Sequence, residues 1–195
     1  MYCGDPNSME RRGCRTALDI LFNYLTTWLA PILTFTTEEV WLERFGNIKT
    51  SIHMEDIPIT PKDWYNQELA TKWTAIRQVR KVVTGAIEVQ RQNKNIGSSL
   101  EASPTVFINN RELFDQVKSI DFAEICITSD LEIKSGAVSK TMFTLDDVDD
   151  VGVIFKLSTG KKCARCWKYV DEIESTEENS DICSRCNHVL NSPKS

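Results

Sequence analysis

The chain has 195 residues, of which 41% are hydrophobic and 26% are charged, with a formal net charge of −5. These are the proportions of a globular protein, and they exclude a disordered or collagen-like chain. No apolar run reaches the roughly 18–20 residues that a membrane span needs, so we expect no membrane segment. Residues 1–15 lack the apolar stretch of a secretory signal, and the odd number of cysteines, 7, favours a reducing compartment.

Residues 13–44 are predicted to form two helices. Apolar side chains recur at helical spacing from Ala17 to Trp28, and Pro31 ends the first helix because proline lacks an N–H group. The signals of the second helix are a cap at Thr34 or Thr36, acids in its first turn at Glu38 and Glu39, and a stop at Gly46.

A third, longer helix is predicted over roughly residues 67–94, capped by Asn66 or Asp63 and broken at 97–99. The side chains expected to form its buried stripe are Leu69, Trp73, Ile76, Val83, Ala86 and Ile87. Residues 70–94 carry six basic side chains against Glu88 alone. Because local patches govern polyanion binding more than total charge does, the basic side chains are candidate nucleic-acid contacts, above all Arg77, Lys81 and Arg91.

The pattern changes after residue 98 to that of a small α+β module. Thr105–Ile108, 124–128 and 151–157 are predicted strands because they are rich in Val, Ile, Phe and Cys, and Arg111–Lys118 is a predicted short helix. The acidic run at Asp146, Asp147, Asp149 and Asp150 is interpreted as a solvated turn, with a metal site as the alternative.

Four cysteines near the end of the chain have the spacing C-x2-C-x16-C-x2-C. Two such knuckles supply four thiolates to one ion and predict a closed, structural Zn²⁺ site, with an iron site or paired disulfides as alternatives. The predicted ligands are Cys163, Cys166, Cys183 and Cys186. The cysteines Cys3, Cys14 and Cys126 are expected to be buried small hydrophobes, and His188 is not needed as a ligand.

Basic and aromatic side chains surround the four cysteines. They are Lys162, Arg165, Lys168, Arg185 and Trp167. The cations can neutralise the thiolates, or they can also contact phosphates. Trp167 can pack beneath the first knuckle, or it can offer a face on which an unstacked RNA base stacks.

The chain resembles the C-terminal part of bacterial-type isoleucyl-tRNA synthetases. Residues 2–5 (YCGD), 28–33 (WLAPIL) and 35–41 (FTTEEVW) are similar to that family's helical anticodon-binding domain. Residues 96–102 (IGSSLEA) are similar to the junction after the long helix, and 162–168 (KCARCWK) with 183–186 (CSRC) resemble the terminal zinc finger.

The resemblance implies a class I ligase that uses ATP to attach isoleucine to its tRNA. Its catalytic signatures His-Ile-Gly-His and Lys-Met-Ser-Lys-Ser do not occur in this chain, so we expect a C-terminal fragment with no catalytic residue of its own. ATP would bind only the catalytic domain of the full-length enzyme. The implied partners are the anticodon stem-loop of isoleucine tRNA and the enzyme's own catalytic and editing domains. In the family, the positions of Arg165 and Trp167 lie in the finger that contacts tRNA.

The expected fold is mainly α, with a truncated helical anticodon-binding domain over 1–97, a small α+β junction over 98–157, a four-cysteine zinc finger over 158–190 and a frayed tail over 191–195. The missing helices would leave apolar surface exposed. We expect a monomer in the cytoplasm, with an organelle as the alternative. The alternative functions are a DNA glycosylase-type zinc-finger fragment and a zinc-stapled protein-interaction module.

Overall fold

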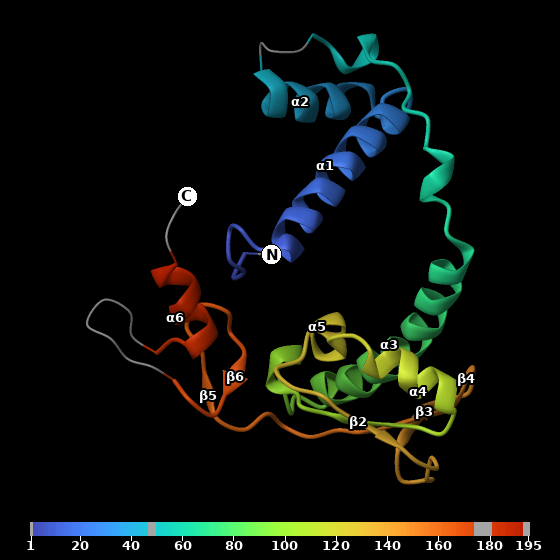
Figure 1. Cartoon of the computed structure of the whole chain (residues 1–195), viewed down its shortest axis with the longest axis vertical. Coiled ribbons are helices and arrows are strands. Elements are labelled where there is room, and N and C mark those ends of the chain that lie inside the picture. The colour runs from blue at the N-terminus through green and yellow to red at the C-terminus, as the bar shows by residue number, and fades with distance from the viewer. Residues whose placement is uncertain (1, 47–49, 174–180, 193–195) are drawn as a thin grey trace. The chain divides into compact units, whose positions relative to one another are not determined.

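The computed structural model describes residues 2–46, 50–173 and 181–192 (Figure 1). These residues divide into two compact units, one up to Tyr65 and one over Asn66–Asn191. Residues 193–195 of the predicted frayed tail and residues 174–180 lie outside the described residues. Domain boundaries at 97 and 157 stay a prediction. No helix of the described ranges is long and apolar enough to cross a membrane.

The first unit holds the helices α1 (Met9–Leu29) and α2 (Thr34–Phe45) and the short 3-10 helices η2 (Ile52–Met54) and η3 (Lys62–Trp64). The first helix begins four residues earlier than predicted because the side chain of Ser8 accepts a hydrogen bond from the N–H of Arg11 and caps it. Its end just before Pro31 is confirmed.

The predicted capping of α2 is wrong. Leu33 occupies the cap position without a side-chain bond, and Thr34 is already helical, so neither Glu38 nor Glu39 lies in the first turn. The Glu38 carboxylate instead accepts hydrogen bonds from the Ser51 hydroxyl (2.8 Å) and the Ile52 N–H (2.9 Å), which tie η2 to this helix. Gly46 ends the helix as predicted, with φ at +53° and its N–H donating to the Leu42 carbonyl.

A small core holds this unit together. Trp41 and Ile52 are buried, and the Trp41 ring stacks on Phe22 with centroids 6.2 Å apart. The apolar side chains of α1 beside Phe22 are only partly covered by the described residues, and Leu18, Leu21, Leu25 and Trp28 are about half exposed. The helical spacing of these residues is therefore present, but only part of the stripe has a packing partner.

The second unit begins with α3 (Gln67–Gln92), which Asn66 caps as predicted by accepting a hydrogen bond from the Leu69 N–H. Side chains from Ile76 to Ile87 enter the core. The predicted burial of Leu69 and Trp73 is wrong, since they are 50% and 37% exposed. The sheet and the short helices cover α3 only from about Ile76 onward.

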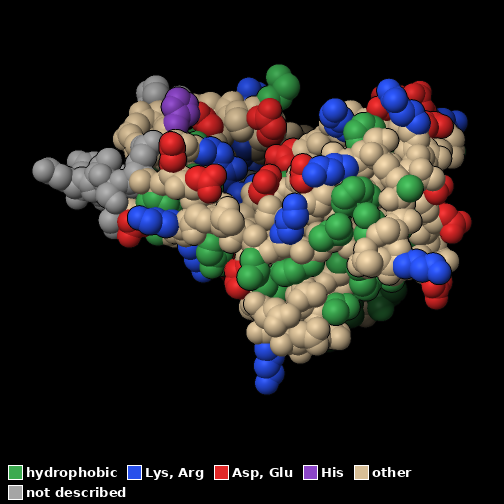
Figure 2. Space-filling model, turned by 90° about the horizontal axis from the view of Figure 1, so that it is seen from below, with side chains coloured by type: hydrophobic (Ala, Val, Ile, Leu, Met, Phe, Trp, Pro, Cys, Tyr) green, Lys and Arg blue, Asp and Glu red, His purple; other side chains and the backbone are tan. Residues whose placement is uncertain are grey.

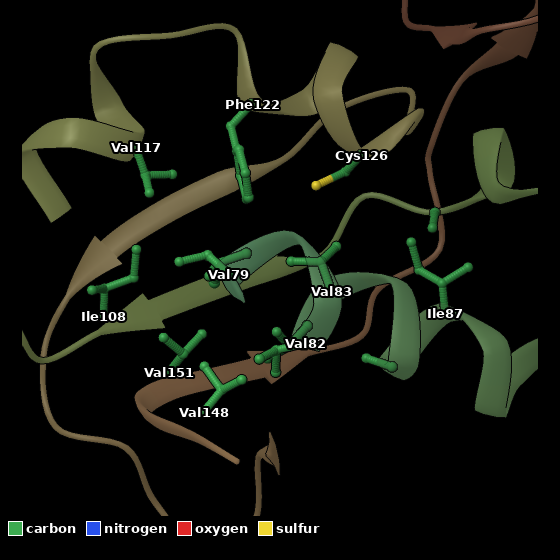
Figure 3. Close-up of a cluster of buried hydrophobic side chains, with 14 of the residues drawn as sticks. Val79, Val82, Val83, Ile87, Ile108, Val117, Phe122, Cys126, Val148 and Val151 are labelled. Carbon is green, nitrogen blue, oxygen red and sulfur yellow. The ribbon is translucent and has the colours of Figure 1, made fainter. Parts of the chain in front are cut away.

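The core side of α3 packs on a four-stranded sheet (Figure 3). Its strands are β1 (Thr105–Ile108), β2 (Glu132–Ser135), β3 (Phe143–Leu145) and β4 (Val148–Ile154), in the spatial order β2-β1-β4-β3. The β1–β2 pair is parallel, and the other two pairs are antiparallel. The predicted strand at 105–108 is confirmed, whereas the one at 151–157 begins and ends three residues earlier.

Two short helices, α4 (Arg111–Lys118) and α5 (Phe122–Cys126), lie between β1 and β2 in the chain. The predicted helix at 111–118 is confirmed. The predicted strand at 124–128 is wrong: Asp121 caps a helical turn by accepting from the Glu124 N–H (3.0 Å), and this turn buries Phe122 and Cys126 on one face.

The acidic run forms the hairpin between β3 and β4. Asp146 and Asp147 make the turn, and Asp149 and Asp150 are exposed in β4. Lys81 of α3 pairs with Asp147 at 2.5 Å. No group of metal-ligand side chains is found here among the described residues.

A 3-10 helix at Ser99–Glu101 (η4) lies between α3 and β1, and the chain leaves β4 for the cysteine region. This region holds the two-stranded ribbon β5 (Lys161–Lys162) and β6 (Tyr169–Val170) and the helix α6 (Ser184–Asn191). We call residues 98–157 the sheet module and residues 158–190 the finger.

Candidate metal centre and nucleic-acid interface

The four predicted ligand cysteines come together at one point of the finger. Two lie on the turn after β5, and two lie at the start of α6. Their sulfur atoms all lie within 4.8 Å of one another, and all but Cys166 are buried. In the part of the chain that is described, no other His, Cys, Asp or Glu group could hold a metal ion.

Backbone hydrogen bonds build the first knuckle. The Cys163 N–H donates to the Lys168 carbonyl and the Trp167 N–H donates back to the Cys163 carbonyl, both at 2.9 Å. Trp167 adopts a left-handed conformation with φ at +66°, which closes the turn. The Cys183 N–H donates to the Cys163 sulfur at 3.3 Å and so joins the two knuckles.

The sulfur distances bear on the alternatives to a metal site. Cys166 Sγ and Cys183 Sγ are 3.8 Å apart, well beyond the ~2.05 Å of a disulfide. All four cysteines are free thiols, so the structure disfavours paired disulfides. Four converging sulfurs without an open position are the donor set of a structural metal ion.

The pKa values of Cys163, Cys166 and Cys186 are shifted in different directions. Burial raises the pKa of Cys163, but backbone N–H groups of its neighbours donate to the sulfur and bring the pKa down to about 6. Burial raises the pKa of Cys166, and it raises that of Cys186 to about 12 although the Arg165 side chain donates to that sulfur. Four thiolates at this distance repel one another, so a bound cation would be needed to ionise them together.

The two arginines of the finger face the sulfurs. Arg165 donates to Cys186, and Arg185 donates to Cys166. Burial lowers the pKa of Arg185, but its bond to Cys166 and the nearby sulfur charges outweigh burial and raise it. Both guanidinium groups therefore neutralise the cysteine cluster, the first of the two roles considered from the sequence.

Trp167 and Lys162 are both exposed on the finger. Trp167 is 61% exposed, which disfavours the alternative that it is buried beneath the knuckle. The Lys162 ammonium lies 5.6 Å from the centre of the Trp167 ring, within the range of a cation–π contact. Lys168 is half-buried, and its carbonyl closes the knuckle. A flat aromatic face beside an exposed cation can accept a base and its phosphate.

The three basic candidates on α3 are exposed, but each already has local partners. Arg77 donates to the Trp73 carbonyl (3.3 Å), Lys81 pairs with Asp147, and Arg91 pairs with Glu88 at 2.7 Å. Figure 2 shows basic and acidic side chains interspersed over the face that it draws. RNA contacts at these positions stay predictions, since two of the three would exchange one ionic partner for another.

The cysteines outside the cluster and His188 differ in how deeply they are buried. Cys126 is buried, as expected, and burial raises its pKa to about 12. Cys14 is exposed and Cys3 half-buried, so the expectation that both are core residues is wrong. His188 is exposed on α6 and is not a member of the cysteine cluster.

Comparison with known proteins places this geometry in a family. Residues 1–106 match the family described as the anticodon-binding domain of tRNA ligase. The chain belongs to this anticodon-binding family. Residues 160–189 match a second family, described as a zinc finger found in FPG and IleRS, so the cysteine cluster lies within a known type of finger.

Individual relatives agree with both matches. The chain is 45% identical over 185 residues to an isoleucine–tRNA ligase of Bartonella henselae, 44% over 185 residues to that of Brucella abortus, and 43% over 190 residues to that of Ruegeria pomeroyi. These alignments cover 95–97% of the chain but 19% of each relative. The chain therefore spans about a fifth of the length of the curated relatives it matches, and its resemblance to isoleucyl-tRNA synthetases is confirmed.

Proposed function

We propose that this chain is the part of a class I isoleucine–tRNA ligase that binds the anticodon stem-loop of isoleucine tRNA. The catalytic and editing domains of the full-length enzyme would lie outside this chain, and the catalytic domain would use ATP to attach isoleucine. The observation that carries the proposal is the occurrence of two matches in one chain, an anticodon-binding domain over 1–106 and a four-cysteine finger over 160–189.

Zn²⁺ is the proposed ion of the finger, held by Cys163, Cys166, Cys183 and Cys186. The donor set fits, because four sulfurs lie within 4.8 Å of one another with cationic groups around them. Structural zinc supplies about 10–16 kcal/mol to the folding of small finger peptides, and here it would stabilise the knuckles that carry Trp167.

The side chains of the finger have separate roles in this proposal. Arg165 and Arg185 face the sulfurs and would stabilise the metal site. Trp167, being exposed, would stack with one unpaired base of the anticodon loop, and Lys162 beside it would contact the neighbouring phosphate. Lys168 and the α3 side chains Arg77, Lys81 and Arg91 would add phosphate contacts that are not sequence-specific.

The two alternative functions are not favoured. A DNA glycosylase-type fragment would share the finger but not the anticodon-binding domain that precedes it here. A zinc-stapled protein-interaction module would not account for the anticodon-binding match over residues 1–106. Monomeric state and cytoplasmic location remain predictions.

The test is a titration of the zinc-loaded chain with isoleucine tRNA and with a non-cognate tRNA at two salt concentrations. Phosphate contacts make log K fall with log salt by about 0.7–0.9 per contact, so a steep dependence is expected together with a preference for the cognate tRNA. Equal affinity for both tRNAs would contradict anticodon recognition by this chain. Absence of binding with zinc present would contradict its RNA-binding role altogether.

A further inference from the structure

The hydroxyl of Ser129 joins three segments that are far apart in the sequence. It donates to the Leu100 carbonyl at 2.5 Å and accepts from the Tyr169 N–H at 2.7 Å. Ser129 and Leu100 belong to the sheet module, whereas Tyr169 begins β6 of the finger. A single oxygen atom thus connects the two parts.

A second attachment lies where the chain enters the finger. The Ser103 N–H donates to the Lys156 carbonyl (2.9 Å), and the Ser158 N–H donates to the Glu101 carbonyl (2.7 Å). Between them, Ala102 and Leu157 form an antiparallel bridge. The segment that leads into β5 is therefore held by backbone bonds, and Ser129 holds β6, so both strands of the ribbon are attached to the same stretch of the module.

Within the sheet module, both Ser129 and the Leu100 carbonyl that it binds are held in place by the local backbone. Ser98 and Glu101 form a capping box around η4, which positions the Leu100 carbonyl. Ser129 follows Ile127, which ends α5 in the left-handed conformation with φ at +58°. This conformation is unusual for a β-branched residue, and it directs the chain so that the Ser129 N–H also donates to the Ala102 carbonyl (3.3 Å).

The turn before β5 packs tightly against β6 within the finger. Gly160 precedes β5 with φ at +88°, and a Cβ atom at this position would lie 2.2 Å from the Val170 carbonyl oxygen. The turn into the finger therefore packs directly on the backbone of β6, one residue beyond the Tyr169 amide that Ser129 binds.

We propose that Ser129 is a positioning residue that locks the finger in one orientation on the sheet module. The hydroxyl acts through Tyr169, which is paired with Lys162 across the ribbon, so it sets the place of Lys162 and of the adjoining Trp167. This inference rests on the proposed RNA-binding function, because a fixed orientation presents the base-stacking face at a defined distance from the basic side chains of α3 in the same unit.

The experiment compares Ser129→Ala with Ser103→Ala in the zinc-loaded full chain. Ser103 lines the same small cavity as Ser129, and its hydrogen bond to the Lys156 carbonyl is made by the backbone N–H, which alanine retains, so it provides the matched control. Ser129→Thr, which retains the hydroxyl, tests rescue. Zinc content and amide spectra establish that each variant is folded.

Three readouts are then compared. Ser129→Ala should speed amide hydrogen exchange at Tyr169 by about tenfold. In the same variant, the residual dipolar couplings of the finger and of the sheet module should no longer fit one common orientation. The affinity for an anticodon stem-loop of isoleucine tRNA should fall by roughly three- to tenfold, the range expected for one lost hydrogen bond. Ser103→Ala should leave all three unchanged, and Ser129→Thr should restore them.

Unchanged Tyr169 exchange and unchanged couplings in Ser129→Ala would overturn the lock. Loss of the common orientation without loss of RNA affinity would overturn its role in recognition. If the wild-type chain binds no RNA, the proposed function fails, and the exchange and coupling data still decide whether Ser129 fixes the finger. If Ser129→Ala does not fold, Ser129→Cys weakens the same two hydrogen bonds, because a thiol is a weak donor and a weak acceptor, and it should produce the same uncoupling.

Discussion

Replacing Trp167 by alanine should separate RNA binding from stability. About two fifths of the indole is covered, since 61% is exposed. A fully enclosed Trp buries about 150–250 Å², so the covered part corresponds to roughly 60–100 Å², or at most about 1.5–2.5 kcal/mol at about 25 cal/mol per Å². Structural zinc contributes about 10 kcal/mol or more to such a finger, so the variant should stay folded and metal-loaded. The loss of one stacked base should weaken RNA binding by about 1–3 kcal/mol, or roughly 5–150-fold.

The assay is fluorescence anisotropy of a labelled anticodon stem-loop, with zinc content and thermal melting measured on the same samples. Trp167→Phe retains an aromatic face and should retain most of the affinity, so it serves as the matched control. RNA affinity within twofold of wild type in a folded, zinc-loaded Trp167→Ala variant would refute the stacking role.

Three further changes test other parts of the structure. Cys183→Ser should abolish zinc retention and the amide dispersion of the finger while the sheet module keeps its spectrum; full zinc retention would contradict the four-sulfur site. Ile76→Ala should lower the free energy of unfolding in urea by about 2–5 kcal/mol, because Ile76 is fully buried in the core, and a loss below about 1 kcal/mol would argue against that packing. The hydrogen bond from Lys81 holds the pKa of Asp147 below its ordinary value of 3.8. Its stabilising effect is therefore present above the unfolded pKa and is lost as the pH falls through the folded pKa; Lys81→Ala should raise the Asp147 pKa in an NMR titration, and an unchanged value would mean that the pair does not form.

Sequence reasoning succeeded where the signal is local. Thr105–Ile108 is a short run of β-branched and apolar residues, which favours a strand. Asn66 caps α3 because its side chain accepts a hydrogen bond from the N–H of Leu69, only three residues later. The cysteine spacing alone was sufficient to predict the cluster, because two C-x2-C pairs have few other structural uses.

It failed where the local composition is ambiguous and where the partner is distant in the chain. Residues 124–128 have strand-like composition, but the Asp121 cap and the burial of Phe122 with Cys126 favour a helical turn. Glu38 resembles a first-turn acid, yet its carboxylate binds Ser51 and Ile52 instead. Ser129 has no recognisable pattern around it, since its two hydrogen-bond partners lie 29 and 40 residues away.

The long helix α3 has an evolutionary consequence. The anticodon-binding match extends to residue 106, inside β1, yet the buried side chains of α3 pack with β4, which lies wholly beyond that match. The family match therefore ends inside the core that α3 forms with the sheet, and the two do not share a boundary. A chimaera of two relatives joined after residue 106 would combine α3 and half of β1 from one parent with β4 from the other. A crossover between Tyr65 and Asn66 keeps the core from one parent, so tolerated exchanges within this family should cluster there.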